Sequence, residues 1–456
     1  MADNKNGIEQ GALESMTTPH TLTGSDLAEL MVDAHEKSLA AVNDLTDEQM
    51  LVPQLDIVNP LLWEIGHLAW FGERWILRHL RGEEPFLKQT DSLYDSMAVA
   101  HDTRWDLPLP SREETLRYMQ QVLDRVVELV RPKERPGEEE TYFYQMVAYH
   151  EYMHAEAFTH TRQTLGFPPP RLFADREGAG SAEAGGGLLA GDAVVPGGSY
   201  MLGGKPDMPF VFDNEKWAHA VEVAPFRIAR AAVTNAEFAG FVDDGGYRRR
   251  ELWTDEGWAW REKEKAEHPV YWKKTSDGWQ RRHFDRLVRL EEDHPVIHVN
   301  WHEAGAYCKW ADRRLPTEAE WELAASAEPA PGGKGFTERK RMYPWGDEPP
   351  AAGRASLDSR TMGCIDAGAL PAGDSAFGCR QMIGNVWEWT SSTFGPFPGF
   401  VPDPYKDYSQ PWFETRKVLR GGAWATRVRM IRNTWRNFFT PDRRDIFAGF
   451  RTCAKD

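Results

Sequence analysis

A stretch rich in glycine and alanine divides this chain and limits how it can fold. REGAGSAEAGGGLLAGD, at residues 176–192, offers almost nothing that could pack into a core, so we expect a linker or mobile loop over 171–193. A chain of 456 residues is long enough for two or three domains, each with its own core. The sequence therefore predicts a domain on each side of the linker, over 25–170 and 194–456, after a flexible N-terminus at 1–24.

The first domain has the hydrophobic spacing of helices. Apolar residues recur at the helical period in four segments, 26–45, 59–82, 111–130 and 141–166. Ser25 is the expected N-cap of the first segment, and Ser111 with Glu114 forms a capping-box pattern at the third. Pro60 at the start of the second segment and Gly82 after it are typical helix boundaries. Four helices joined by loops predict an antiparallel bundle.

The second domain has a different texture. From about residue 194 onward the strand-like segments are short, turns are dense, and glycine, proline and tryptophan are frequent. Most of the 19 tryptophans lie beyond residue 215, which is typical of irregular loops held in place by large side chains. The expected fold class is therefore α+β, with a helical bundle followed by a domain of mixed and irregular structure.

Charge and composition argue against several classes of partner. The net charge is −16 and there is no long basic run, which disfavours nucleic acid and anionic membranes as main partners. No apolar run approaches the ~18–20 residues of a membrane helix, and the first 25 residues lack the pattern of a secretory signal. The four cysteines include no CxxC pair, so a cytoplasmic protein without a disulfide framework is expected.

Three histidines of the helical domain have the placement of metal ligands. His150 and His154, in the sequence HEYMH, are four residues apart on a predicted helix, so both imidazoles face the same side. His67 lies among apolar residues that should face the interior of the bundle, where facing helices build metal sites. His160 lies six residues after His154 and should point away. Fe(II) and Zn(II) suit three imidazoles equally well, so the ligand types alone leave the metal open.

Two other interpretations of these histidines stay open at this point. HExxH is also the spelling of a zinc-hydrolase helix, although the longer HExxHxxGxxH pattern is absent. The histidines could also be hydrogen-bonded residues of a bundle without catalytic function, which would leave the second domain as a binding module.

Six sequence blocks occur in order over roughly residues 190–456 of the second domain. They read VPGGSYMLGG (195–204), PVIHVNWHEAGAYCKWADRRLPTEAEWELAA (295–325), YPWGDE (343–348), GNVWEWTSS (384–392), VLRGGAWAT (418–426) and AGFRTC (448–453). This set resembles the formylglycine-generating-enzyme (sulfatase-modifying factor) fold, a C-type-lectin-like domain. Formylglycine generation itself requires a pair of cysteines near the C-terminus, and only Cys453 stands there.

The helical domain resembles the DinB-type bundle that precedes this fold in the ergothioneine-synthase family. That resemblance implies a non-heme Fe(II) enzyme that uses O2 to join a sulfur or selenium donor to the imidazole C2 of hercynine, which is N-trimethylhistidine. It also implies that His67, His150 and His154 hold the iron, and that the remaining small-molecule substrate is a selenosugar or a thiol.

The resemblance also implies a substrate pocket late in the second domain. The family holds the amino-acid part of hercynine with an asparagine followed by aromatic residues, which correspond to Asn437 and Phe438. Two positions depart from the mycobacterial-type pattern. Phe439 stands where those enzymes carry an aspartate used with γ-glutamylcysteine, and Phe394 lies in the loop where they carry a proton-donating tyrosine. The aromatic residues can equally be core, and Arg436 a structural ion-pair residue.

The loop after the second helix supplies the chalcogen-donor pocket in the family. Here it reads SLYDSMAVAHDTRWDLPLPS (92–111), where Arg104 is expected to pair with an anionic donor and Tyr94 to donate a proton. Each side chain could instead form a hydrogen bond that only stabilises the loop. The loop and the helix before it look closer to the selenoneine-synthase branch, whose donor is a selenosugar. A sugar donor would not need the aspartate that Phe439 replaces. Cysteine or γ-glutamylcysteine, as in ergothioneine synthesis, is the alternative.

Overall fold

The computed structural model describes residues 22–171 and 186–455, and these fall into two compact units. The first unit is helical, and the second contains all the strands of the described chain. Most of the predicted N-terminus and of the predicted linker lies outside the described residues. At the described end of that linker, the backbone N–H groups of Gly186 and Gly187 donate to Asp366 Oδ2 at 3.1 and 3.0 Å, and a strand begins at Asp192.

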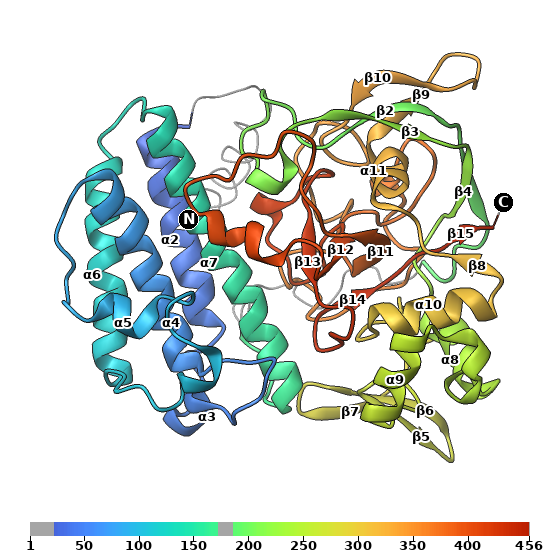
Figure 1. The fold of residues 1–456 in the computed structure, drawn as a ribbon, viewed down its shortest axis with the longest axis horizontal. Coiled ribbons are helices and arrows are strands. Elements are labelled where there is room, and N and C mark those ends of the chain that lie inside the picture. The colour runs from blue at the N-terminus through green and yellow to red at the C-terminus, as the bar shows by residue number, and fades with distance from the viewer. Residues whose placement is uncertain (1–21, 172–185, 456) are drawn as a thin grey trace, which may run out of the picture. The chain divides into compact units, whose positions relative to one another are not determined.

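The helical unit is built from four long helices. Its helices are α2 (Gly24–Ala40), α3 (Asp47–Leu51), α4 (Leu61–Gly72), α5 (Thr90–Tyr94), α6 (Arg112–Val130) and α7 (Glu138–Leu165). A π-helical segment, η1 (Glu73–Leu80), continues α4 directly, so the single helix expected over 59–82 has two parts. The helix α2 packs against α6 and α7, and α4 also packs against both of them, which confirms the predicted bundle (Figure 1).

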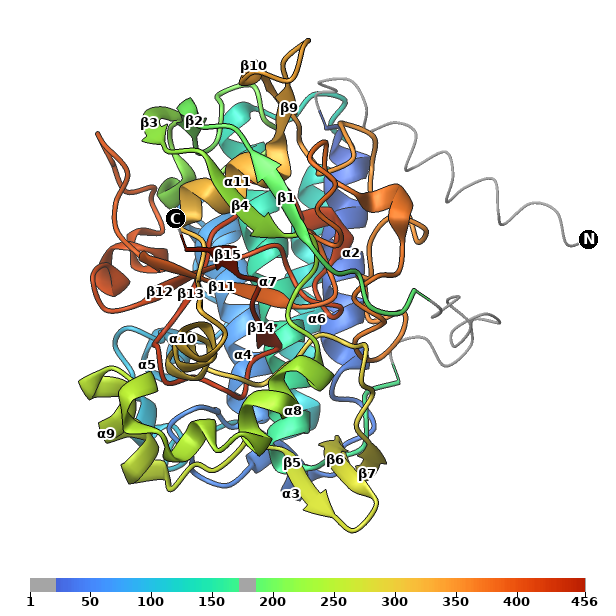
Figure 2. The same ribbon diagram turned by 90° about the vertical axis from the view of Figure 1, so that its right-hand side faces the viewer.

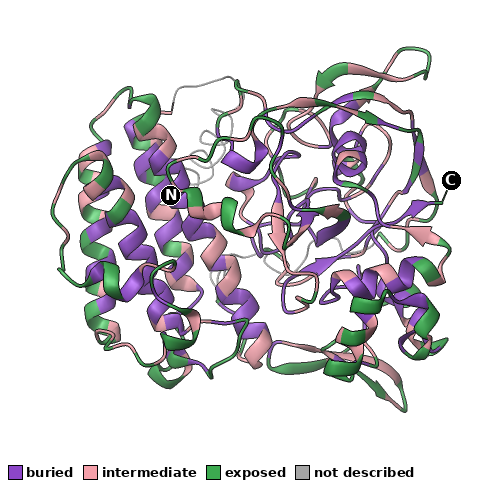
Figure 3. Ribbon diagram, in the orientation of Figure 1, coloured by how far each residue is buried: buried purple, intermediate pink, exposed green. Residues whose placement is uncertain are grey.

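The ends of these helices follow from local side-chain chemistry. The Ser111 hydroxyl accepts a hydrogen bond from Glu114 N, and Glu114 Oε2 accepts one from Ser111 N at 2.9 Å, so the predicted capping box is confirmed. The expected N-cap at Ser25 is wrong, because α2 begins one residue earlier and Thr23 forms a capping box with Asp26. The inward faces of the four helices are buried, as Figure 3 shows.

The second unit combines four helices with short strands. Its helices are α8 (Asn235–Asp243), α9 (Asp255–Glu264), α10 (Trp301–Trp310) and α11 (Glu318–Ser326). Its strands are β1 (Asp192–Val195), β2 (Gly198–Leu202), β3 (His219–Val223), β4 (Phe226–Ala229), β5 (Trp272–Thr275), β6 (Gly278–His283), β7 (Arg286–Arg289), β8 (Arg313–Arg314), β9 (Ala327–Pro329), β10 (Phe336–Lys340), β11 (Trp387–Thr393), β12 (Lys417–Arg420), β13 (Asn437–Phe439), β14 (Ala448–Gly449) and β15 (Cys453–Ala454). The α+β fold class is confirmed.

Two four-stranded sheets organise this unit. One has the strand order β1-β4-β15-β8 and the other has β13-β12-β11-β14, in which β14 runs parallel to β11 and the remaining pairs are antiparallel. Figure 2 shows β1, β4 and β15 of the first sheet and all the strands of the second. None of the helices in the described part of the chain combines the length and the apolar character needed to cross a bilayer.

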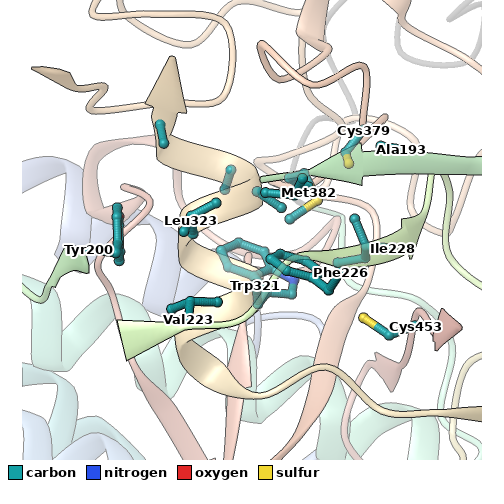
Figure 4. Packing of buried hydrophobic residues seen from close by; sticks show 14 of the residues in the cluster. Ala193, Tyr200, Val223, Phe226, Ile228, Trp321, Leu323, Cys379, Met382 and Cys453 are labelled. Atoms are coloured by element: carbon teal, nitrogen blue, oxygen red, sulfur yellow. The ribbon is translucent and has the colours of Figure 1, made fainter. Parts of the chain in front are cut away.

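The core of the second unit is centred on α11. Trp321 is fully buried in a cluster with Phe226, Ile228 and Met382, as the close view in Figure 4 shows. Its indole N–H donates to Glu388 Oε2 at 2.7 Å, so even this central ring has its polar atom paired.

Buried ion pairs join α11 to the central sheet. The guanidinium of Arg420, on β12, has no solvent exposure and pairs with Glu318 at 2.8 Å and with Glu322. Arg451 makes two hydrogen bonds to Glu388, on β11, at 2.6 and 2.7 Å. Each charge is therefore neutralised inside the fold, because an unpaired buried charge would be strongly destabilising.

We expect Glu388→Gln to destabilise the second unit strongly, because it leaves the Arg451 guanidinium buried without a counter-charge. Breaking a buried pair costs about 3–5 kcal/mol. Thermal unfolding of the full chain should therefore begin at a clearly lower temperature. The control is Asp243→Asn, which removes the exposed pair with Lys274 and should cost less than about 1 kcal/mol. Equal unfolding temperatures for both variants would contradict the argument.

Candidate metal centre

Three imidazoles from two helices converge inside the bundle. His67 lies on α4, and His150 and His154 lie one turn apart on α7. One nitrogen of each ring lies within 4.8 Å of those of the other two, and His67 Nε2 is 3.3 Å from His150 Nε2. No other such cluster of histidine, cysteine and acidic side chains occurs among the described residues, and His160 is not a member. Packing of α4 on α7 therefore brings the three predicted ligands together.

Burial keeps at least two of these rings neutral. Desolvation, helped by the neighbouring His154, lowers the pKa of His67 to about 3. Desolvation and the same neighbour also hold the pKa of His150 well below its usual value. Neutral imidazoles carry a lone pair on one nitrogen, which is the form that binds metal ions.

A backbone carbonyl fixes the orientation of His67. Its Nδ1 lies 2.8 Å from the carbonyl oxygen of Tyr94, so the Nδ1–H donates there and the lone pair is on Nε2, which faces His150. The Tyr94 side chain, predicted as a proton donor, is buried and hydrogen-bonds Thr115, and burial raises its pKa to about 12. The contribution of Tyr94 that the structure shows is thus its carbonyl, while its role as an acid stays a prediction.

Gly66 allows the Tyr94 segment to approach α4. A β-carbon at this position would lie 2.3 Å from Tyr94 Cε1, which is far closer than any real contact. Because Gly66 carries only a hydrogen atom, the Tyr94 ring can pack directly against the backbone of α4, next to His67. This close approach places the Tyr94 carbonyl within reach of the imidazole.

A carboxylate that the sequence analysis missed lies behind His154. Glu64 is 4% exposed, and its Oε1 is 3.4 Å from His154 Nδ1. The sequence does contain a pattern that could have indicated this residue. Glu64 lies three residues before His67 in WEIGH, so a helix places both side chains on the same face.

The acid of the HExxH spelling faces away from the three rings. Glu151 Oε1 lies 3.9 Å from His35 Nδ1 on α2, and burial raises the Glu151 pKa to about 8. A zinc hydrolase of this type uses that glutamate as a general base beside the metal. Because Glu151 is directed at α2, the hydrolase interpretation lacks its base.

Three converging imidazoles, two of them buried and neutral, are a donor set that fits a divalent transition-metal ion. The set leaves coordination positions for substrate, as catalytic sites require. Its ligand types suit Fe(II) and Zn(II) alike.

Arg104, the predicted partner of an anionic donor, has several partners within the helical unit. Its Nη1 donates to Asn59 Oδ1 at 2.7 Å, and its Nη2 donates to the carbonyls of Ser96 and Val99 at 3.1 and 3.2 Å. Its guanidinium also lies 4.0 Å from the centre of the Trp63 ring. These contacts hold the loop on α4, and pairing with a donor stays a prediction.

Two of the predicted pocket residues of the second unit form an aromatic stack. Phe394 and Phe438 lie face to face with ring centres 3.9 Å apart, and Phe394 is completely buried. Asn437 Oδ1 accepts a hydrogen bond from Phe438 N at 2.9 Å. Phe439 lies beside the guanidinium of Arg443. Phe394 thus packs as a core residue, whereas the other three remain partly exposed.

The arginines near this stack are held by acids. Arg436 makes two hydrogen bonds to Glu318 at 2.7 and 3.1 Å and lies over the Phe394 ring, so the structural interpretation of this residue accounts for its contacts. Arg443 pairs in the same way with Asp445 at 2.6 Å.

Comparison with known proteins identifies both regions of the chain. The DinB superfamily matches residues 30–158, and the Sulfatase-modifying factor enzyme 1-like domain matches residues 183–456. This chain is 38% identical to a protein of Mycolicibacterium thermoresistibile named hercynine oxygenase, over 96% of each chain. It is 37% identical to the hercynine oxygenase of Mycobacterium tuberculosis, over 96% of this chain and 99% of the relative. The formylglycine-generating enzyme of Thermomonospora curvata is 32% identical and spans only 59% of this chain, with 94% of its own length covered.

We expect Gly66→Ala to weaken metal binding, because the added methyl group displaces the Tyr94 ring and with it the carbonyl that orients His67. A lost outer partner of a ligand costs roughly 10–100-fold in metal affinity. Titration of the metal-free protein with Fe(II) under anaerobic conditions measures the change. Gly137→Ala is the control, because a β-carbon there meets no atom within 4 Å. Unchanged affinity in Gly66→Ala would show that the close approach is dispensable.

Proposed function

Because the chain belongs to the hercynine oxygenase family, we propose that it joins a chalcogen donor to the imidazole C2 of hercynine, using O2 and an Fe(II) ion. Membership of this family makes the protein an oxidoreductase enzyme. The observation that carries the proposal is the convergence of His67, His150 and His154 inside the DinB-type bundle. The resemblance assigns these three residues to iron.

The chain's own residues have defined tasks in this proposal. The three histidines bind the ion through neutral rings, and burial of His67 and His150 keeps them unprotonated. The Tyr94 carbonyl holds His67 in the tautomer that binds metal. When bound, Fe(II) supplies the activation of O2 and lowers the pKa of a thiol or selenol donor.

The overall reaction balances with one molecule of O2. Replacing C2–H and a chalcogen–H by a carbon–chalcogen bond releases two protons and two electrons. Oxidation of that chalcogen to its oxide releases two more electrons. The four electrons reduce O2, of which one oxygen atom ends in the oxide and the other in water.

We place hercynine against the aromatic stack of the second unit. Asn437 and the partly exposed Phe438 are proposed to contact its amino-acid part, since an aromatic face attracts a trimethylammonium group. Phe394 is buried and stacks on Phe438, so it holds the Phe438 ring in place for this contact.

A selenosugar is the donor that the sequence departures favour. Phe439 supplies no carboxylate to a γ-glutamylcysteine donor, and Phe394 supplies no hydroxyl as a proton donor. Arg104 and Tyr94 remain the proposed polar residues on the donor side. An ergothioneine-type sulfoxide synthase using cysteine or γ-glutamylcysteine is the second candidate, supported by the relatives' names.

Formylglycine generation has little support in this chain. The four cysteines are unpaired, and Cys453 and Cys379 are completely buried. Burial raises the pKa of Cys453 to about 12, which disfavours the thiolate that such chemistry needs.

We expect the protein to prefer a selenosugar when several donors compete. The assay offers hercynine, air and equal amounts of a selenosugar, cysteine and γ-glutamylcysteine to Fe(II)-loaded protein, and mass spectrometry identifies the product. A selenium adduct of hercynine is the expected result. If the main product is the sulfoxide of a hercynine adduct with cysteine or γ-glutamylcysteine, the donor is a thiol and the selenosugar proposal is wrong. Absence of any hercynine product would contradict the proposed reaction itself.

We also expect His154→Ala to lose both bound iron and product, since two imidazoles remain from a set of three. Iron content after anaerobic loading and product yield are measured together. His160→Ala is the matched control, because it removes a histidine of the same helix that lies outside the cluster. Full activity and full iron content in His154→Ala would contradict the proposed ligand set.

A further inference from the structure

We propose that Glu64 is a positioning residue of the metal centre, which accepts the Nδ1–H of His154 and so directs His154 Nε2 at the ion. This inference deepens the proposed function and rests on its metal site. It assigns Asn59 and Arg104 a role in the same arrangement, as the residues that hold the Glu64 carboxylate in place.

The geometry places Glu64 behind His154. Glu64 precedes His67 by three residues on α4, so both side chains lie on the face that meets α7. Glu64 Oε1 is 3.4 Å from His154 Nδ1, slightly beyond the usual range of about 2.7–3.2 Å for an N–H···O hydrogen bond, so the proposed bond requires a small approach of the two side chains. Among the described residues, this nitrogen has no closer partner. A carboxylate facing a buried ring nitrogen that lacks another partner is therefore the natural acceptor of its proton.

A short relay fixes the carboxylate. Asn59 Nδ2 donates to Glu64 Oε1 at 3.1 Å, and Asn59 Oδ1 accepts from Arg104 Nη1 at 2.7 Å. The guanidinium of Arg104 is itself held by backbone carbonyls and by the face of Trp63. The Arg104 charge partly compensates the charge of the buried Glu64 through one intervening side chain.

The arrangement gives two of the three ligands an outer partner. His67 donates its Nδ1–H to the Tyr94 carbonyl, and His154 has the Glu64 carboxylate in the corresponding place. An outer partner fixes the tautomer and makes the coordinating nitrogen more basic, and a carboxylate does so more strongly than a neutral carbonyl. His154 is the least buried of the three rings, so packing restrains its orientation least and a hydrogen-bonded partner has the largest effect there.

Two other roles for Glu64 make different predictions. A fourth metal ligand would belong to the cluster of converging ligand atoms, and Glu64 does not. A purely structural acid would be expected to have both oxygens paired, whereas Glu64 Oε2 is buried without a hydrogen-bond partner among the described residues.

The test compares Glu64→Ala, Glu64→Gln and Asn59→Ala with the unaltered full chain. Fe(II) affinity is measured anaerobically against a chromogenic chelator, and the visible spectrum of the Co(II)-loaded protein reports the coordination. We expect Glu64→Ala to weaken Fe(II) binding roughly 10–100-fold. Glu64→Gln should bind more tightly than Glu64→Ala, because an amide oxygen still accepts the Nδ1–H. Asn59→Ala should weaken binding less than Glu64→Ala.

Glu73→Gln is the matched control. Glu73 is a second buried carboxylate, directly after α4, and it accepts hydrogen bonds from Tyr118, Thr90 and the backbone of Phe86. Its substitution perturbs the same part of the bundle without touching the three histidines. Fe(II) affinity and the Co(II) spectrum of Glu73→Gln should match those of the unaltered protein, whatever the change in unfolding temperature.

Each outcome supports or overturns the inference. Unaltered affinity and spectrum in Glu64→Ala would overturn it while leaving the metal centre intact. A Co(II) spectrum showing one ligand fewer in both Glu64 variants would make Glu64 a ligand and overturn the positioning role. If Glu64→Ala fails to fold, Glu64→Gln decides, and a Fe(II) affinity and Co(II) spectrum identical to those of the unaltered chain would overturn the proposal. Failure of the unaltered chain to bind any divalent ion would overturn this inference together with the proposed function.

Discussion

Both units depend on the requirement that a buried charge have a partner. In the second unit, Arg420 and Arg451 lie inside the fold, and the carboxylates of Glu318, Glu322 and Glu388 neutralise them. The Arg420 pairs join α11 to β12, and the Arg451 pair joins β11 to the segment between β14 and β15, so the core is held by directional contacts as well as by apolar packing. In the helical unit, the buried Arg104 and Glu64 do not contact each other directly. Asn59 lies between them and forms a hydrogen bond with each.

The same burial that makes charges costly prepares the histidines for a metal ion. Desolvation keeps His67 and His150 neutral, and neutrality leaves their lone pairs available. The partners behind the rings then decide which nitrogen carries the lone pair. The proposed metal site thus combines apolar packing with two groups behind the rings, the Tyr94 carbonyl and the Glu64 carboxylate.

The sequence predicted the helical bundle and the common face of two histidines through periodic patterns, whereas the fold of the second unit was expected from its resemblance to a known family. Helical spacing predicted the bundle, and the four-residue separation of His150 and His154 predicted their common face. It could not reveal the Tyr94 carbonyl, since every residue has one and only the packing at Gly66 makes this one important. The sequence also could not show the partners of Arg104, because backbone carbonyls and Asn59 come within its reach only through the packing of the loop. Thr23 is the N-cap in place of Ser25, because the Thr23 hydroxyl accepts from Asp26 N while the Asp26 carboxylate accepts from Thr23 N.

The 3.3 Å contact between the Nε2 atoms of His67 and His150 bears on the order of assembly. In the absence of an ion, one of these nitrogens can carry a proton and donate it to the other, so the two buried rings satisfy each other. Both rings also pack within the aromatic interior of the bundle, where His67 stacks on Trp63 and His150 stacks on Phe71. The two rings therefore have a partner in the folded chain without a metal. Because both rings are neutral, binding of an ion would only require the His150 proton to move from Nε2 to Nδ1. His154, the least buried of the three rings, takes no part in this closest contact.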